Sequence, residues 1–148
     1  MKLFLLDTDH SSFYQRGHAA VRANILRTPP AQLALSVITA EELLRGRLAQ
    51  IRAAQNEAEQ IRACYWLGET LELLKKFAIL PYDQLASQHY QTLRLQKLRV
   101  GSQDLRIAAV ALAAQATLVT ANRTVQVSQR ATVRNHGPGT VVACRPLA

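Results

Sequence analysis

The chain is poor in cysteine and has no long apolar run, and both absences narrow what it can be. Its two cysteines, Cys64 and Cys144, are too few and too far apart for a zinc-binding pattern, and nothing else in the sequence indicates secretion. No segment approaches the roughly 20 apolar residues of a membrane-spanning helix, and the N-terminal apolar stretch is too short for a signal peptide. We therefore expect a cytoplasmic protein with reduced thiols and no membrane segment.

Acidic residues are absent from the C-terminal third of the chain. All 10 Asp and Glu lie at or before Asp104, whereas residues 105–148 carry Arg106, Arg123, Arg130, Arg134 and Arg145. The 18 Lys and Arg give a formal net charge of +8. Such an excess favours anionic partners such as nucleic acid or acidic membrane surfaces. A solvated basic surface explains most of these arginines equally well.

Apolar segments with the strand pattern alternate with segments of helical periodicity. Strands are expected at 3–6, 32–37, 78–80 and 117–120, and Val133 with 141–143 leaves room for a fifth. Helices are expected at 11–16, 18–27, from Thr39 onward, 56–77, 83–98 and 103–115. This alternation predicts an α/β fold, a three-layer α/β/α sandwich around a parallel sheet of about five strands. With 148 residues, 49% of them apolar, we expect a single domain over 1–148.

The helical periodicity also predicts which side chains face the core. On the long helix over 56–77 the expected inward stripe is Ile61, Cys64, Tyr65, Leu67, Leu71 and Leu74. Leu43, Leu44 and Leu48 should be inward on the preceding helix, and Leu85, Tyr90, Leu93 and Leu98 on the following one. Tyr65 and Trp66 are predicted to lie in the core or a subunit interface rather than to stack on bases.

Acidic residues recur where the predicted strands end. Asp7 follows the strand 3–6, Glu42 lies in the first turns of the helix after the second strand, and Asp104 lies in the first turn of the helix before the fourth. The carboxyl ends of parallel strands form the ligand-binding edge of such sheets. Carboxylates that converge there need a hard divalent cation, and oxygen ligands suit Mg²⁺ or Mn²⁺. An acidic metal site in a basic protein is the combination that phosphodiester cleavage requires.

Four sequence blocks together resemble the signature of PIN-domain nucleases, and most closely the VapC-type toxins of bacterial toxin–antitoxin pairs. The blocks are 6–11 (LDTDHS), 36–46 (SVITAEELLRG), 104–109 (DLRIAA) and 118–122 (LVTAN). The resemblance implies a Mg²⁺- or Mn²⁺-dependent endoribonuclease in which Asp7, Glu42 and Asp104 bind the metal. It further implies that Thr8, Asp9, Thr120 and Asn122 orient ligands and water.

The same resemblance implies partners for the chain. They are an RNA substrate, often a tRNA or ribosomal RNA in this family, a small VapB-like antitoxin that inserts a segment into the cleft, and a second copy in a homodimer. A DNA-directed nuclease of the same fold is an alternative that the sequence leaves open.

The sequence departs from the family pattern after its last block. Relatives usually carry an acid about three residues after the Asn of that block, followed by an aromatic, and here Val125 and Gln126 occupy those positions. The site is then one carboxylate short, and Asp9 is a candidate for partial compensation. An alternative hypothesis is therefore a degenerate PIN domain that binds RNA or a protein partner with little or no catalysis.

Structural roles compete with the functional ones at each position. Asp7 and Asp9 are residue types that commonly cap helices, and Glu42 has the spacing of a capping-box partner for an N-cap at Thr39. Asp104 carries the negative charge that the helix dipole favours in a first turn. Four independent caps need not fall in this order at one sheet edge, which favours the metal site. The histidines, His10, His18, His89 and His136, show no metal-ligand spacing and are predicted to be surface or packing residues. Arg45, Arg47, Arg99 and Arg106 fit either an RNA groove or solvated helix faces.

Overall fold

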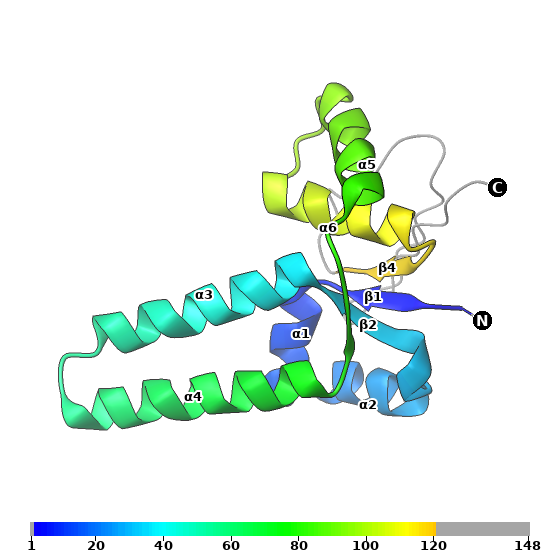
Figure 1. Cartoon of the computed structure of the whole chain (residues 1–148). Coiled ribbons are helices and arrows are strands. Elements are labelled where there is room, and N and C mark those ends of the chain that lie inside the picture. The colour runs from blue at the N-terminus through cyan, green and yellow to red at the C-terminus, as the bar shows by residue number, and fades with distance from the viewer. Residues whose placement is uncertain (1, 121–148) are drawn as a thin grey trace.

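The computed structural model describes residues 2–120 as helices packed on a small parallel sheet (Figure 1). The elements are β1 (Phe4–Leu6), α1 (Thr8–Gln15), α2 (Ala19–Arg27), a 3-10 turn (Pro30–Gln32), β2 (Leu33–Ser36), α3 (Val37–Ala53), α4 (Glu57–Lys75), β3 (Ala78–Leu80), α5 (Gln84–Leu95), α6 (Ser102–Ala113) and β4 (Thr117–Val119). No helix within this range is both long and apolar enough to cross a membrane.

The sheet has four parallel strands in the order β3-β2-β1-β4. β1 lies in the interior, with Leu6 opposite Leu35 of β2 on one side and Val119 of β4 on the other. This pairing confirms the predicted parallel α/β fold and brings the ends of β1 and β4 to one sheet edge. The fifth strand that we expected from Val133 and 141–143 falls outside the described residues.

The two faces of the sheet bury separate apolar clusters. Leu5, Ala34 and Leu118 point into a cluster with α5 and α6, to which α6 contributes an almost continuous run of buried residues from Ile107 to Ala111. Leu6, Leu35 and Val119 point to the opposite face and pack against α1, α2 and α4. Figure 1 shows these helix layers above and below the strands, which confirms the three-layer architecture. Such burial of both faces explains why β1, β2 and β4 are mainly apolar without polar alternation, whereas the edge strand β3 is largely exposed.

Two helices begin earlier than the sequence suggested. α1 starts at Thr8 rather than Ser11, because the Asp7 side chain accepts a hydrogen bond from the backbone N–H of His10 and caps the helix. α3 starts at Val37, and its N-cap is Ser36; the predicted N-cap, Thr39, lies inside the first turn and donates its N–H to Ser36 Oγ. The prediction of Thr39 as the cap was therefore wrong, and Glu42 does not occupy the capping-box position.

Most of the inward stripe predicted on α4 was also wrong, although Leu74 is partly buried and packs against the core. Ile61, Tyr65 and Leu71 are 68%, 57% and 46% exposed, and α4 instead buries Ala63, Thr70 and Leu73. Leu48 on α3 and Leu85 on α5 are likewise exposed, whereas Tyr90 and Leu93 are buried as expected. The reason is visible in Figure 1, where α3 and α4 run antiparallel and project from the sheet as a two-helix arm. Each arm helix buries only the face toward its neighbour or the sheet.

Replacement of the α3 cap tests this description. Ser36 is fully buried, accepts from Thr39 N–H at 3.0 Å and donates to Thr39 Oγ1 at 3.1 Å. We expect Ser36→Ala to lower the free energy of unfolding by about 1–2 kcal/mol, since the cap is removed and a buried N–H is left unpaired. Urea denaturation measures this change in the free energy of unfolding. Ser102→Ala is the control, because Ser102 is exposed and α6 has no side-chain cap. Equal losses in both variants would contradict the assignment.

Candidate metal centre

Asp7 is held firmly where β1 ends and α1 begins. Its backbone N–H donates to the carbonyl of Val119 at 3.0 Å, which continues the β1–β4 pairing by one residue. Its carboxylate Oδ1 accepts from His10 N–H at 2.8 Å and lies 3.0 Å from His10 Nδ1. The residue is only 7% exposed. Backbone and ring contacts together fix the direction of this carboxylate at the interior strand of the sheet.

His10 is the residue at this site that the sequence argument missed. It is 2% exposed, and because a carboxylate can only accept, its Nδ1 is the donor in the contact with Asp7. A ring that donates to a ligand carboxylate is a common way to orient it. The signal was present in the spacing, since a histidine three residues after a helix N-cap lies beside the cap's side chain. Our prediction of a surface or packing role did not include this contact.

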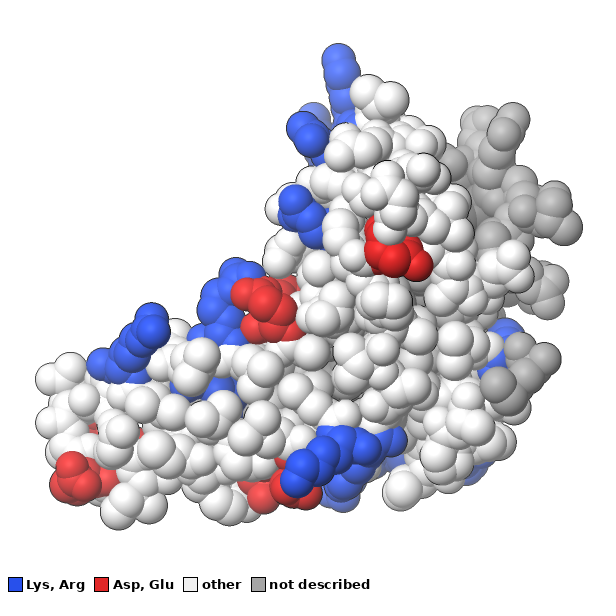
Figure 2. All heavy atoms as spheres, viewed as in Figure 1, with Lys and Arg blue, Asp and Glu red and all other residues white. Residues whose placement is uncertain are grey.

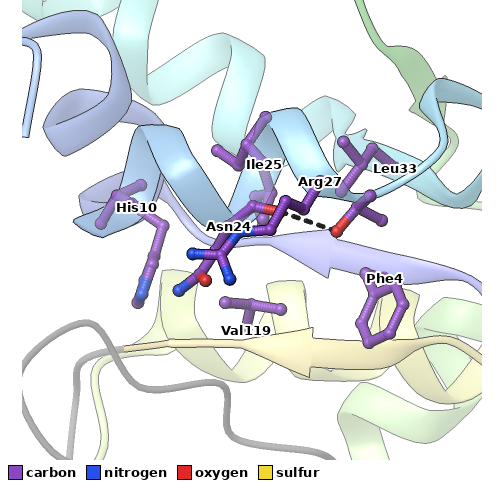
Figure 3. Close-up of a pocket in the computed structure, with 10 residues that line it drawn as sticks. Phe4, His10, Asn24, Ile25, Arg27, Leu33 and Val119 are labelled. Atoms are coloured by element: carbon purple, nitrogen blue, oxygen red, sulfur yellow. Dashed lines mark hydrogen bonds between the residues drawn. The ribbon is translucent and has the colours of Figure 1, made fainter. Parts of the chain in front are cut away.

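His10 also lines a separate, mainly apolar pocket. Nε2 is buried and has no hydrogen-bond partner among the described residues. Figure 3 shows this pocket with Asn24, Ile25 and Arg27 on α2 and with Val119 on β4. The dashed bond in that view is the 2.8 Å contact from Thr28 Oγ1 to the carbonyl of Asn24. This pocket lies between α2 and the sheet and does not include Glu42.

Glu42 and Thr8 connect α3 to the start of α1. Thr8 Oγ1 donates to Glu42 Oε1 at 2.9 Å, so the two elements that follow β1 and β2 meet at the carboxyl edge of the sheet. Burial raises the pKa of Glu42, the negative charge of Asp104 raises it further, and the Thr8 hydrogen bond and Arg45 oppose these effects. Glu42 and Asp104 therefore lie close enough to repel one another, although they are far apart in the sequence.

Asp9 and Thr120 complete the polar surroundings of Asp7. Partial desolvation raises the pKa of Asp9, the charge of Asp7 adds to the rise, and His10 and Arg16 oppose it. Thr120 directly follows β4 and is buried. Asp104 lies in the first turn of α6 and is half-buried. Asn122, Val125 and Gln126 fall outside the described residues.

The donors present have the chemistry of a hard-cation site, without a complete coordination shell. Within residues 2–120, no three His, Cys, Asp or Glu side chains lie close enough together to hold one ion. The donors at the edge are all oxygen atoms, and burial together with the like charge of a neighbouring carboxylate raises the pKa of two of them, Asp9 and Glu42. A divalent cation relieves such repulsion, so the donor set fits Mg²⁺ or Mn²⁺.

Comparison with known proteins places this geometry in a family. The PIN domain family matches residues 6–127, and the chain belongs to that family. Similar solved structures include FitAcB from Neisseria gonorrhoeae, with 27% identity, 81% of this chain and 88% of the other covered, and a TM-score of 0.65. DNA-bound VapBC from Salmonella typhimurium shares 25% identity, with 84% and 90% covered and a TM-score of 0.67.

A third similar structure, VapBC-1 from nontypeable Haemophilus influenzae, has 27% identity, coverage of 81% and 87%, and a TM-score of 0.60. The structural neighbours are thus the VapC and FitB toxins of toxin–antitoxin complexes. No curated protein matches the chain significantly. The resemblance seen in the four sequence blocks is confirmed at the level of the family and of these neighbours.

The raised pKa of Glu42 predicts a stability effect. A carboxyl whose pKa is raised in the folded protein destabilises the fold where it is ionised, and the penalty vanishes as the pH falls through that pKa. We expect Glu42→Gln to raise Tm at pH 7 by roughly 1–3 °C, the amount expected for a partly screened group. Gln keeps an oxygen for the Thr8 hydroxyl. The gain should shrink toward zero as the pH is lowered.

Differential scanning calorimetry from pH 4 to 8 measures this effect. Glu41→Gln is the matched control, because Glu41 is exposed and forms an ion pair with Arg45. That variant should show no stabilisation at any pH. A Glu42→Gln protein with the same Tm as the wild type at pH 7 would show that the site places no electrostatic penalty on the fold.

Proposed function

We propose that the chain is a divalent-metal-dependent endoribonuclease and the toxin of a toxin–antitoxin pair. The observation that carries this proposal is the Asp7 carboxylate, oriented by His10 at the interior strand of a PIN-domain sheet. Thr8 and Glu42 meet at the same edge, and Glu42 experiences the charge of Asp104. Buried carboxylates of like charge are costly to the fold, which supports their retention for function.

In this proposal Asp7, Glu42 and Asp104 are the ligands of Mg²⁺ or Mn²⁺, for which their carboxylates must approach one another more closely than they do in this structure. Thr8, Asp9, Thr120 and Asn122 orient ligands and water. The cation supplies Lewis acidity for activating water and for stabilising the leaving oxygen of the phosphodiester. His10 keeps the Asp7 carboxylate in one orientation, and the Thr8 hydroxyl does the same for Glu42. Hydrolysis with water attacking phosphorus in line leaves a 5′-phosphate and a 3′-hydroxyl.

RNA as the substrate and an antitoxin as the partner belong to the same proposal. The net charge of +8 favours both a phosphate backbone and an acidic protein segment. Similar structures are VapBC and FitAcB assemblies, which supports a VapB-like antitoxin for this chain. Several large apolar side chains of the arm are exposed, among them Leu48, Ile61 and Tyr65. Exposed apolar side chains that lie on one part of a protein support a contact with another protein, such as a second copy in a homodimer.

A second candidate is a degenerate PIN domain that binds RNA or a protein without cutting. Val125 stands where relatives carry an acid, which favours this alternative. A DNA-directed nuclease is the third possibility, since the same chemistry cleaves both nucleic acids. The three are distinguished by whether the protein binds metal, whether it cleaves, and which polymer it cleaves.

Replacement of Asp7 tests the metal site. Asn is as good an N-cap as Asp, so Asp7→Asn should fold normally and remove only the charge. We expect Mn²⁺ binding measured by calorimetry to disappear, and cleavage of a tRNA, rRNA and single-stranded DNA panel to fall by about 100-fold or more. The estimate is a lower bound, because even residues that only orient metal ligands typically contribute about 10–100-fold.

Asp83→Asn is the matched control, because Asp83 caps α5 through the same kind of bond, Asp83 Oδ1 accepting from Ala86 N–H at 2.9 Å. It should retain metal binding and cleavage. If the wild type binds RNA but neither binds Mn²⁺ nor cleaves any polymer, the degenerate binding domain replaces the nuclease. Cleavage confined to DNA would instead support the third possibility.

A further inference from the structure

A groove leads away from Glu42 along the two-helix arm. Its first part is lined by Thr8 and Glu42, and its second part by Arg62 and Trp66 of α4. Both parts share Arg16, Arg47 and Gln50, so the two hollows adjoin one another along these side chains. The two hollows measure about 360 and 530 Å³. The groove thus begins at the candidate metal centre and ends between α3 and α4.

Arg47, at the centre of the groove, is held by neutral acceptors from three helices. Its Nη2 donates to Gln15 Oε1 at 2.8 Å, its Nε to Thr70 Oγ1 at 3.0 Å, and its Nη1 to Gln50 Oε1 at 3.1 Å. Its guanidinium also lies 5.2 Å from the centre of the Trp66 ring. Thr70 is fully buried, Gln15 and Arg47 are half-buried and Gln50 is exposed, so this network reaches from the protein interior to the groove. The charge of Arg47 is fixed in place, yet none of these contacts neutralises it.

The arginines of the groove form no ion pair within residues 2–120. The Arg and Lys ion pairs in that range are Arg45 with Glu41 and Lys75 with Glu72, and neither involves Arg16, Arg47 or Arg62. Glu59, the acid of the second hollow, accepts a bond from the backbone N–H of Gln55 at 2.7 Å. Burial lowers the pKa of Arg47, and the nearby charge of Arg16 lowers it further. Two cations held together in this way favour an anionic ligand between them.

We propose that this groove binds the phosphate backbone of the RNA at nucleotides away from the cleaved bond, with Arg16, Arg47 and Arg62 contacting successive phosphates. The inference rests on the proposed endoribonuclease function. RNA is favoured over an acidic protein segment because the groove is continuous with the carboxylates at Glu42, where the cleaved phosphate must lie. An ordered arginine plane beside an indole is also a surface suited to single-stranded nucleic acid.

A charge-matched pair of double variants tests the groove. Arg16→Gln with Arg62→Gln removes two groove charges and leaves Arg47, whose bonds join three helices. Arg52→Gln with Arg94→Gln removes two exposed arginines that do not line the groove. Both pairs are made with Asp7→Asn, so that a fluorescein-labelled 20-nucleotide single-stranded RNA is not cut. Fluorescence anisotropy is then measured over a range of salt concentrations.

The groove variant should bind the RNA about tenfold more weakly than the control pair. The slope of log affinity against log salt should fall by about 0.7 for each phosphate that the variant no longer binds, whereas the control pair should keep the slope of the single Asp7→Asn protein. With Asp7 intact, the groove variant should raise KM for the 20-mer, and the single variant Arg62→Gln should raise it without lowering kcat. Arg62 lines only the hollow between α3 and α4. The single variant should therefore cleave a trinucleotide as well as the wild type does, because so short an RNA does not reach Arg62.

The outcomes separate this inference from the proposed function. If the wild type cleaves RNA and the groove variant matches the control pair in affinity, salt slope and KM, the groove proposal is overturned while the nuclease stands. Loss of binding to a 12-residue polyglutamate peptide with unchanged RNA binding would assign the groove to an acidic protein partner and also overturn it. A wild type that neither binds nor cleaves RNA would remove both proposals.

Discussion

The hydrogen bond from the Asp7 backbone to the carbonyl of Val119 is the contact on which the site depends. It extends the pairing of β1 and β4 by one residue, so the carboxylate stands directly after the last β1–β4 residue pair. The Asp7 side chain then starts α1 by accepting from His10 N–H. One residue thus ends a strand, begins a helix and points a buried charge at the sheet edge. The positions of Thr8 and His10 follow from the same turn.

The candidate metal centre is a balance between opposing electrostatic effects. Burial and the charge of Asp104 raise the pKa of Glu42, and the Thr8 hydroxyl and Arg45 lower it. Asp9 experiences the same kind of opposition between Asp7 on one side and His10 and Arg16 on the other. Asp9 and Glu42 thus each lie near a like charge within a protein of net charge +8. Figure 2 shows lysine and arginine side chains along the arm beside smaller acidic patches. Such a division suits a substrate whose backbone is anionic and whose cleavage needs a cation.

The strand predictions held better than the helix-face predictions, for a physical reason. A short apolar run such as 3–6 has few alternatives to a strand buried on both faces, and the parallel sheet supplied those two faces. Helical periodicity defines a stripe without identifying what covers it. On α4 the stripe through Ile61, Tyr65 and Leu71 is exposed, because packing against α3 and the sheet uses Ala63, Thr70 and Leu73 instead. The prediction of Thr39 as an N-cap failed for a similar reason. Serine and threonine both favour the N-cap position, and only the end of β2 at Ser36 determines which of the two residues caps α3.

The sequence alone determined the order of acids and strands, and with it the family. Asp7, Glu42 and Asp104 each follow from where an apolar run stops or a helix starts, which is local information. Only the tertiary structure decided that Thr8 bonds Glu42 and that Arg47 is held by Gln15 and Thr70. These contacts join residues far apart in the chain. Their formation depends on how the helices pack around the sheet, which no short stretch of sequence encodes.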